Sequence, residues 1–324
     1  QGDNEEGEDA SQVSQERSQG SKEGTPVTDY RVLSSTSLGY RLYDEQSGCV
    51  SLHPKRGRLR NASGILVGDL VTLDKDGFID TVLERKNFLA RPRLSNADVV
   101  LVLVSAKEPD FSSYLLDKFL TMVKFYSLKP AIVLTKCDML KKKELLTLRK
   151  RMEDYVRLSF PVFFLSNRDD KAFDFPLLRE FLLHKCVALM GQTGVGKSSL
   201  INLIDPTLRR KIDDLRISLG RGRHTTKEVI LLPYEGGFLF DTPGFSSLDL
   251  VKMRPSDLAI CFPGYEGFVK KCYFNDCLHL ESTKGCMVKE EIKSGCLSPD
   301  SYKNYLKIYE EVKANDVWKK KKEY

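Results

Sequence analysis

Residues 191–198 read Gly-Gln-Thr-Gly-Val-Gly-Lys-Ser and fit the pattern GxxxxGK[ST]. In such a loop the backbone N–H groups surround phosphates, the lysine reaches the β and γ phosphates, and the hydroxyl binds Mg²⁺. An apolar run over 186–190 precedes the loop, and a helical run over 199–204 follows it. A glycine-rich turn with a surface lysine is the alternative, but this context favours a nucleotide site. The residues expected at the phosphates are Gly191, Gln192, Thr193, Gly194, Val195, Gly196, Lys197, Ser198 and Ser199.

The chain around this loop alternates between buried strands and amphipathic helices. Helical apolar spacing is clear over 115–123 and 145–156. Strands that alternate with helices indicate a doubly wound, mostly parallel sheet, which we assign to residues 93–253. The expected strands are 98–104, 131–134, 162–165, 186–190, 229–232 and 237–240.

A guanine-recognition motif follows the strand expected at 131–134. Thr135-Lys136-Cys137-Asp138 fits [NT]KxD, in which the carboxylate accepts hydrogen bonds from guanine N1 and N2 while the lysine stem lies along the ring. Adenine has no such donor pair and would leave Asp138 unpaired, at a cost on the order of 3 kcal/mol. Ser166 and Asn167, after the next strand, are expected to give a backbone contact to the guanine O6.

A magnesium shell is expected from three further elements. Asp241-Thr-Pro-Gly244 fits DxxG, so Asp241 would hold Mg²⁺ through water and the Gly244 N–H would meet the γ phosphate. Ser198 supplies the hydroxyl of the phosphate loop. The pair Thr225-Thr226 lies where a switch loop belongs, and the spacing does not choose which hydroxyl completes the shell.

The order of these motifs is unusual, because the base reader precedes the phosphate loop. The same sheet forms from this order only if the chain is circularly permuted, which is tolerated because domain termini lie at the surface. The second switch then leads directly into the C-terminal segment, so nucleotide state is expected to reach that segment through a short covalent link.

The N-terminal part divides into two segments. Residues 1–26 are polar, carry a net charge of −5 over 1–24 and should be disordered. Residues 27–92 contain short β-like runs at 38–43, 49–52, 66–73 and 78–83, which predict a small OB-type β-barrel. The loop 53–60 between two of these runs suits phosphate-backbone contacts, although a solvated loop is equally expected. Its cations are Lys55, Arg56, Arg58 and Arg60.

Net charge and hydropathy indicate which partners the protein binds and in which compartment it acts. The net charge is +6, so the chain beyond the acidic leader carries +11, which suits a polyanion such as RNA as well as a merely solvated surface. No apolar run approaches the 18 residues of a membrane span, and no secretory signal is present. We expect a monomer without a membrane partner, either in a bacterial cytoplasm or, if the leader belongs to a processed form, in an organellar stroma or matrix.

The cysteine pattern indicates a metal site. Of eight cysteines only three cluster tightly, so a reducing compartment with one metal site is favoured over a disulfide framework. Cys272-x4-Cys277-x-His279-x6-Cys286 supplies three thiolates and one imidazole, which suit a closed, structural, tetrahedral Zn²⁺. The surrounding residues 254–324 predict a mainly helical module. It contains a helix that starts at Ser298-Pro299. The tyrosines of this helix are expected to pack in the interior of the module, and the helix ends in the basic run 319–322.

Taken together, the motifs resemble the RsgA (YjeQ) family of circularly permuted, ribosome-assembly GTPases. The resemblance covers about residues 30–312 and rests on GQTGVGKSS, GRHTT, DTPGF, the permuted order and Glu108-Pro-Asp-Phe111. It implies an OB domain, a permuted P-loop GTPase with Mg²⁺ and GTP, a zinc module, and action on the small ribosomal subunit and its rRNA late in maturation. The gap before Cys286 is six residues, where the family usually has five.

The resemblance also implies the catalytic residue. Phe245 follows DxxG where Ras-like enzymes place a water-orienting glutamine, so intrinsic hydrolysis should be slow. The resemblance makes His224 the residue that orients water, with a surface-loop histidine as the alternative. Arg221 and Arg223 are expected either to offset transition-state charge or to bind RNA. Two functions remain open: a subunit-stimulated GTPase, and a GTP-binding RNA scaffold with little hydrolysis. A P-loop kinase is disfavoured by DxxG and TKxD.

Overall fold

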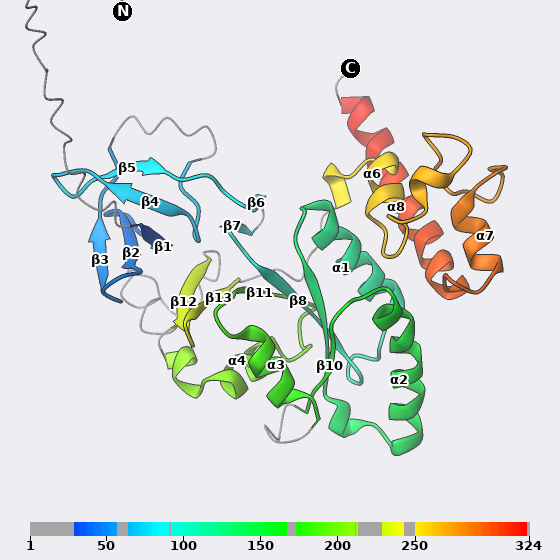
Figure 1. Ribbon diagram of the computed structural model, residues 1–324, viewed down its shortest axis with the longest axis horizontal. Helices are drawn as coiled ribbons and strands as arrows, with labels where there is room; N and C mark the ends of the chain where they lie inside the picture. Colours follow the sequence, from blue (N-terminus) through cyan, green and yellow to red (C-terminus); the bar gives the residue numbers. More distant parts are fainter. Residues whose placement is uncertain are drawn as a thin grey trace, which may run out of the picture.

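The computed structural model describes residues 29–56, 64–90, 92–166, 173–210, 212, 229–242 and 250–322. Figure 1 shows three parts in chain order: an antiparallel sheet near the N-terminus, a central α/β layer, and a helical module at the C-terminus. Several predicted features lie outside the described residues. They are the leader 1–26, Arg58, Arg60, Asn167, the switch segment 220–226, Gly244 and Phe245.

The first part is a five-stranded antiparallel sheet with the order β3-β2-β1-β4-β5. A parallel bridge between Lys55 and Ile79 joins the segment after β3 to β5, so the two edges of the sheet approach each other as in an OB barrel. The interior consists of Val32, Leu42, Ile65, Val71 and Ile79. The strands are β1 (Tyr30–Ser35), β2 (Tyr40–Asp44), β3 (Val50–His53), β4 (Leu70–Leu73) and β5 (Ile79–Val82).

The central sheet has the order β10-β9-β8-β11-β13-β12. The first five strands are parallel and β12 runs antiparallel to β13, which confirms the mostly parallel sheet. Its strands are continuous apolar runs because helices cover both faces. They are β8 (Val99–Ser105), β9 (Pro130–Thr135), β10 (Val162–Phe164), β11 (Cys186–Met190), β12 (Ile230–Tyr234) and β13 (Gly237–Asp241).

The helices divide between the two faces of this sheet (Figure 1). Alternate residues of β8 face opposite ways, as strand geometry requires. Val100, Val102 and Val104 pack with α1 (Ser113–Phe125) and α2 (Lys142–Arg157). The intervening Val99, Leu101 and Leu103 pack with α3 (Phe175–Leu182) and α4 (Lys197–Ile204). The helices cover the two faces of the sheet but not the carboxyl ends of its strands, which is where open α/β sheets bind ligands.

The C-terminal module is helical, as predicted, and packs on α1. Its core combines Phe262, Tyr265 and Tyr305 with Met122 of α1. Tyr305 is fully buried, so this tyrosine packs in the core and does not face a ligand. The elements are η2 (Leu250–Lys252), α6 (Pro255–Cys261), η3 (Val269–Lys271), α7 (Met287–Lys293) and α8 (Pro299–Lys322).

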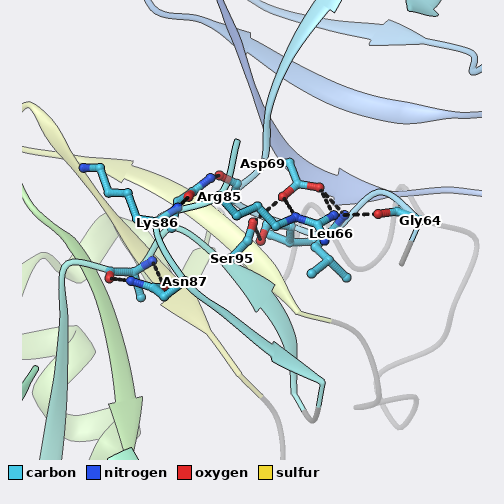
Figure 2. Close-up of polar contacts among 11 residues, drawn as sticks. Gly64, Leu66, Asp69, Arg85, Lys86, Asn87 and Ser95 are labelled. Atoms are coloured by element: carbon cyan, nitrogen blue, oxygen red, sulfur yellow. Dashed lines mark hydrogen bonds and ion pairs between the residues drawn. The ribbon is translucent and has the colours of Figure 1, made fainter. Parts of the chain in front are cut away.

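A short hairpin joins the barrel to the central sheet. It pairs β6 (Phe88–Ala90) with β7 (Arg93–Ser95), so position 92/93 falls between two strands of one hairpin. A buried ion pair holds this junction (Figure 2): Arg85 Nε and Nη2 donate to the two Asp69 oxygens at 2.6 and 2.7 Å, and Ser95 Oγ donates to Asp69 Oδ1 at 2.6 Å. Asp69 is fully buried. Its charge is matched by the arginine, and the hydrogen bond from Ser95 connects this buried pair to β7.

Candidate functional site

The loop between β11 and α4 is shaped by its glycines. A Cβ on Gly191 would come 2.6 Å from the carbonyl oxygen of Leu103 in β8, so only glycine fits there. Gly194 and Gly196 have φ of +80° and +98°, a region that side chains avoid. Val195 is buried and anchors the loop on the sheet, while Thr193 and Ser198 are exposed. The loop therefore carries exposed hydroxyls into the start of a helix, where free backbone N–H groups and the helix dipole favour an anion.

Lys197 lies across this loop. Its Nζ donates to the carbonyl oxygen of Gln192 at 2.8 Å and also to that of Gly191. Partial burial lowers the pKa of Lys197 from its ordinary value, because the ammonium has lost part of its hydration. The ammonium is thus held directly above the loop, where phosphate oxygens would be its stronger partners.

The base-recognition turn contacts the phosphate loop directly. Thr135 ends β9, and its Oγ1 donates to the carbonyl oxygen of Val195 at 2.6 Å. Both groups are buried. The turn 135–138 and the loop 191–198 therefore share one edge of the sheet, although 60 residues separate Thr135 from Val195 in the chain.

The conformation of the turn presents Asp138 to solvent. Lys136 has φ of +58°, and its Nζ donates to the carbonyl oxygen of Glu108. A single turn, η1 (Cys137–Met139), follows, and the Cys137 N–H donates to the carbonyl oxygen of Leu165 at 2.9 Å. Cys137 is buried, which raises the pKa of its thiol to about 12, whereas Asp138 is exposed at the same edge. This turn places a carboxylate, but not the thiol, where it can meet a ligand.

Two other predicted residues lie at the ends of neighbouring strands. Ser166 is buried just after β10, which pairs with β9. Asp241 ends β13 and is half-buried, and Thr242 Oγ1 donates to the carbonyl oxygen of Leu189 in β11 at 3.2 Å. Since β11 and β13 are parallel neighbours, Asp241 lies at the same sheet edge as the phosphate loop. Carboxylate and hydroxyl oxygens are the donors that Mg²⁺ prefers, so Asp241 and Ser198 fit the expected ion.

A second site lies in the C-terminal module. Cys272, Cys277, His279 and Cys286 are all buried, and their ligand atoms lie within 4.8 Å of one another. The distances from His279 Nδ1 to the three sulfur atoms are 3.8, 3.4 and 3.4 Å, in chain order. A tetrahedral Zn²⁺ with ordinary bond lengths would place sulfur and nitrogen about 3.6 Å apart. The donor set and its spacing therefore fit zinc.

The surroundings of His279 orient it as a ligand. Its Nε2 lies 3.3 Å from the carbonyl oxygen of Ala259 in α6, which leaves Nδ1 directed at the sulfur atoms. Burial lowers the pKa of His279 and so favours the neutral ring that binds metals. Gly285 has φ of +65° just before Cys286, so the six-residue gap closes through a conformation that glycine adopts without strain.

Comparison with known proteins agrees with this architecture. The family model described as RsgA GTPase matches residues 82–251, more than half of the chain. The chain belongs to the RsgA GTPase family. The resemblance and the GTPase activity inferred from the motifs are thereby confirmed at the level of the family.

Individual relatives span most of this RsgA-family chain. A protein of Halalkalibacterium halodurans named small ribosomal subunit biogenesis GTPase RsgA is 40% identical over 263 residues, which cover 80% of this chain and 88% of that protein. One of Bacillus cereus with the same name is 36% identical over 280 residues, covering 85% and 94%. Among solved structures, YloQ, described as a circularly permuted GTPase, and YjeQ from Thermotoga maritima are each 32% identical with a TM-score of 0.75. They cover 89% and 88% of this chain, and 96% and 98% of their own.

Two contacts of the RsgA-family site escaped the sequence argument. One is the hydrogen bond from the Thr135 hydroxyl to the carbonyl oxygen of Val195. The other is the hydrogen bond from the Lys136 ammonium to the carbonyl oxygen of Glu108. Both acceptors are backbone carbonyls, which carry no sequence signal. Glu108 belongs to the segment 108–111 that carries the family resemblance, and the hydrogen bond from Lys136 places this segment beside the base-recognition turn.

Proposed function

We propose that this chain hydrolyses GTP to GDP and phosphate, is stimulated by the small ribosomal subunit, and acts late in the maturation of that subunit. The names of its relatives support the partner, and the RsgA family supports the reaction. The single observation that carries the nucleotide site is the hydrogen bond from Thr135 Oγ1 to the Val195 carbonyl oxygen, since it joins base reader and phosphate loop.

Each predicted site residue keeps a role in this proposal. Asp138 and Lys136 hold guanine together with Thr135, Ser166 and Asn167. The loop from Gly191 to Ser199 holds the phosphates, and the Gly244 N–H meets the γ phosphate. Mg²⁺ is held by Ser198, Asp241 and one of Thr225 and Thr226, and it supplies charge that offsets the phosphate oxygens. Asp241 ends β13, and Ser198 lies in the first turn of the helix that follows the neighbouring strand β11, which supports the shared ion.

We assign the water-orienting role to His224. Phe245 has no polar atom with which to position water, so the chain needs another group, and the switch segment offers His224. An imidazole that accepts a proton or orients a hydrogen bond speeds such a step by roughly 10²- to 10⁴-fold. The subunit would act by fixing the segment 220–226 against the nucleotide, which accounts for stimulation by a partner.

The remaining parts contact rRNA. The barrel and the zinc module are the proposed RNA-binding surfaces, with Zn²⁺ as a structural ion held by Cys272, Cys277, His279 and Cys286. In the barrel loop, Arg56 pairs with Asp74 and Asp76, so Lys55 is the better phosphate contact of the two described cations. The protein would act as a monomer in a bacterial cytoplasm or in an organellar stroma or matrix. Within the described residues, no helix has the length and apolar character to cross a bilayer.

GTP turnover with and without small subunits tests the proposal. We expect a strong preference for GTP over ATP and a clear rise in turnover when subunits are added. The alternative, a GTP-binding RNA scaffold, predicts equal turnover for wild type and His224→Ala in the presence of subunits. His184→Asn is a matched control. His184 lies at the opposite sheet edge with φ of +57°, a conformation that asparagine tolerates. Unchanged turnover on adding subunits to the wild type would refute the stimulated enzyme.

A further inference from the structure

An exposed aromatic pair lies in the metal loop. Tyr273 is 80% exposed, the highest exposed fraction among the large apolar side chains that the structure describes, and the adjacent Phe274 is 47% exposed. Their ring centroids are 4.9 Å apart with an interplanar angle of 84°. The other tyrosines of this module behave differently, because Tyr265 and Tyr305 are buried in its core. Neither Tyr273 nor Phe274 belongs to that core, so packing does not account for them.

The backbone under the pair is fixed at several points. Tyr273 and Phe274 lie between the metal ligands Cys272 and Cys277. The Tyr273 N–H donates to the carbonyl oxygen of Gly285 at 2.9 Å, and the Cys277 N–H donates to that of Phe274 at 3.2 Å. With the metal bound, the rings therefore project from a rigid support. A rigid aromatic group loses little conformational entropy when a ligand stacks on it.

Cations flank the aromatic pair. Lys270 and Lys271 immediately precede Cys272, and Lys284 precedes the glycine whose carbonyl oxygen holds Tyr273. All three side chains are exposed, and none forms an ion pair among the described residues, although the Lys271 ammonium lies 5.5 Å from the centroid of the Phe268 ring. Asp276 is an exposed carboxylate of the same loop. Exposed rings in a segment that also carries lysines without acidic partners favour a ligand that combines flat faces with negative charge, which describes single-stranded nucleic acid.

We propose that Tyr273 and Phe274 form a stacking platform for an unpaired RNA base, with Lys270, Lys271 and Lys284 contacting the flanking phosphates. The proposal rests on the proposed function, because it specifies which chemical form of RNA the zinc module binds. Double-stranded RNA keeps its bases stacked inside the helix, so it cannot use the platform. The partner is a single-stranded loop, bulge or end.

The test uses the full-length, zinc-loaded protein and a fluorescein-labelled 12-nucleotide oligoadenylate, with a 12-base-pair RNA duplex as competitor. The Kd is measured by fluorescence anisotropy at several salt concentrations. We expect the Tyr273→Ala/Phe274→Ala protein to bind the single strand about 10- to 100-fold more weakly, since one stacked base contributes that much. Tyr273→Leu/Phe274→Leu should lose nearly as much, while Tyr273→Trp should bind like wild type. Leu146→Ala, at another exposed apolar side chain on α2, is the matched control.

Salt dependence separates stacking from charge. Removing the rings should leave the slope of log Kd against log salt unchanged, whereas Lys270→Gln/Lys271→Gln should reduce that slope by about one to two. Zinc content and GTP affinity, measured on every variant, show whether the module and the nucleotide site remain intact. Loss of RNA affinity with both intact supports the platform.

Three outcomes would overturn the platform: wild-type protein that does not bind the oligonucleotide, leucine variants that bind as tightly as wild type, or variants that bind RNA normally but no longer sediment with small subunits. The last result would assign the rings to a protein partner. Subunit-stimulated GTP turnover by the wild type is measured in parallel. If it is present while the platform variants bind RNA normally, only the platform is wrong; if it is absent, the proposed function itself fails.

Discussion

The two ligand sites of this chain are built in opposite ways. At the edge of the central sheet, Asp138, Thr193 and Ser198 are exposed, and the loop 191–198 leads into the N-terminus of α4. In the C-terminal module, the exposed fractions of Cys272, Cys277, His279 and Cys286 are all 9% or less. An open site suits a ligand that exchanges at every catalytic cycle. A closed one suits an ion that belongs to the fold, and the comparison predicts that losing the two ligands has unequal consequences.

Removal of the metal should give the largest effect. Cys286→Ser, or treatment with a strong chelator, should unfold the C-terminal module, because structural zinc supplies on the order of 10 kcal/mol and the four ligands lie inside its core. Thermal unfolding followed by circular dichroism, with zinc content measured in parallel, checks this. Cys296→Ser is the control, since Cys296 is exposed and outside the cluster. A zinc-free protein that melts like wild type would show that the cluster is not structural.

Removal of the lysine of the open site should weaken nucleotide binding without unfolding the protein. Lys197→Ala is expected to weaken GTP and GDP binding by about 100-fold or more, because charge-assisted bonds to phosphates each contribute about 1.5–3 kcal/mol. Titration with a fluorescent GTP analogue measures the loss, and the melting temperature should stay near that of wild type. Lys185→Ala is the control, because Lys185 precedes β11 at the end opposite the phosphate loop, where its ammonium donates to the carbonyl oxygen of Phe181. Unchanged nucleotide affinity in Lys197→Ala would remove the loop from the site.

Base specificity provides a finer test of the open site. Asp138→Asn should lower GTP affinity about 100-fold and raise affinity for xanthosine triphosphate, because an amide can donate to the carbonyl that xanthine has in place of the guanine amino group. Competition between the two nucleotides measures the change. Asp80→Asn, an exposed carboxylate of the barrel, should have no effect. If Asp138→Asn keeps its preference for GTP, the turn does not read the base.

The residues of both candidate sites could be proposed from the sequence for one shared reason. Motifs such as GxxxxGK[ST] and the Cys/His cluster are local, so spacing alone identifies their residues. The mostly parallel sheet and the permuted order followed from where these motifs lie relative to the strands. The structure then brought Thr135 to Val195 and Asp241 beside β11, which the order of motifs required.

Contacts between parts of the fold could not be predicted in this way. Asp69, Arg85 and Ser95 are polar residues whose burial depends on how the barrel meets β7, and in the sequence they resemble surface residues. Strand β1 lay outside the apolar runs that predicted the barrel, since only its central residues are buried. Gly68 is a further example, because a Cβ there would come 2.2 Å from the carbonyl oxygen of Ser95. This constraint arises only where the barrel packs against β7, so the sequence does not reveal it.

One further buried carboxylate connects the central domain to the C-terminal module. Asp117 of α1 is fully buried and accepts hydrogen bonds from Tyr155 Oη at 2.8 Å, from Asn304 Nδ2 at 2.8 Å and from Ser301 Oγ at 3.3 Å. Asn304 and Ser301 belong to α8, which packs beside the zinc cluster. The Asp117 carboxylate therefore joins α1 of the central domain to α8 of the C-terminal module. Burial outweighs these three donors and raises the pKa of Asp117 to about 6.

The pH dependence of stability tests this junction without removing a ligand. The pKa of Asp117 is raised from 3.8 in the unfolded chain, so the native state holds the proton more tightly. Its contribution is greatest below about pH 4 and is lost as the pH rises to about 6, a change of at most about 3 kcal/mol. Relative to Asp117→Asn, the wild type should therefore lose stability across this window and stay level above it. Zinc release at low pH acts in the opposite direction, but it affects both proteins and cancels in the difference.

Melting temperatures of the two proteins between pH 4 and 8 measure this difference in stability. A constant difference would mean that Asp117 keeps one protonation state across this range.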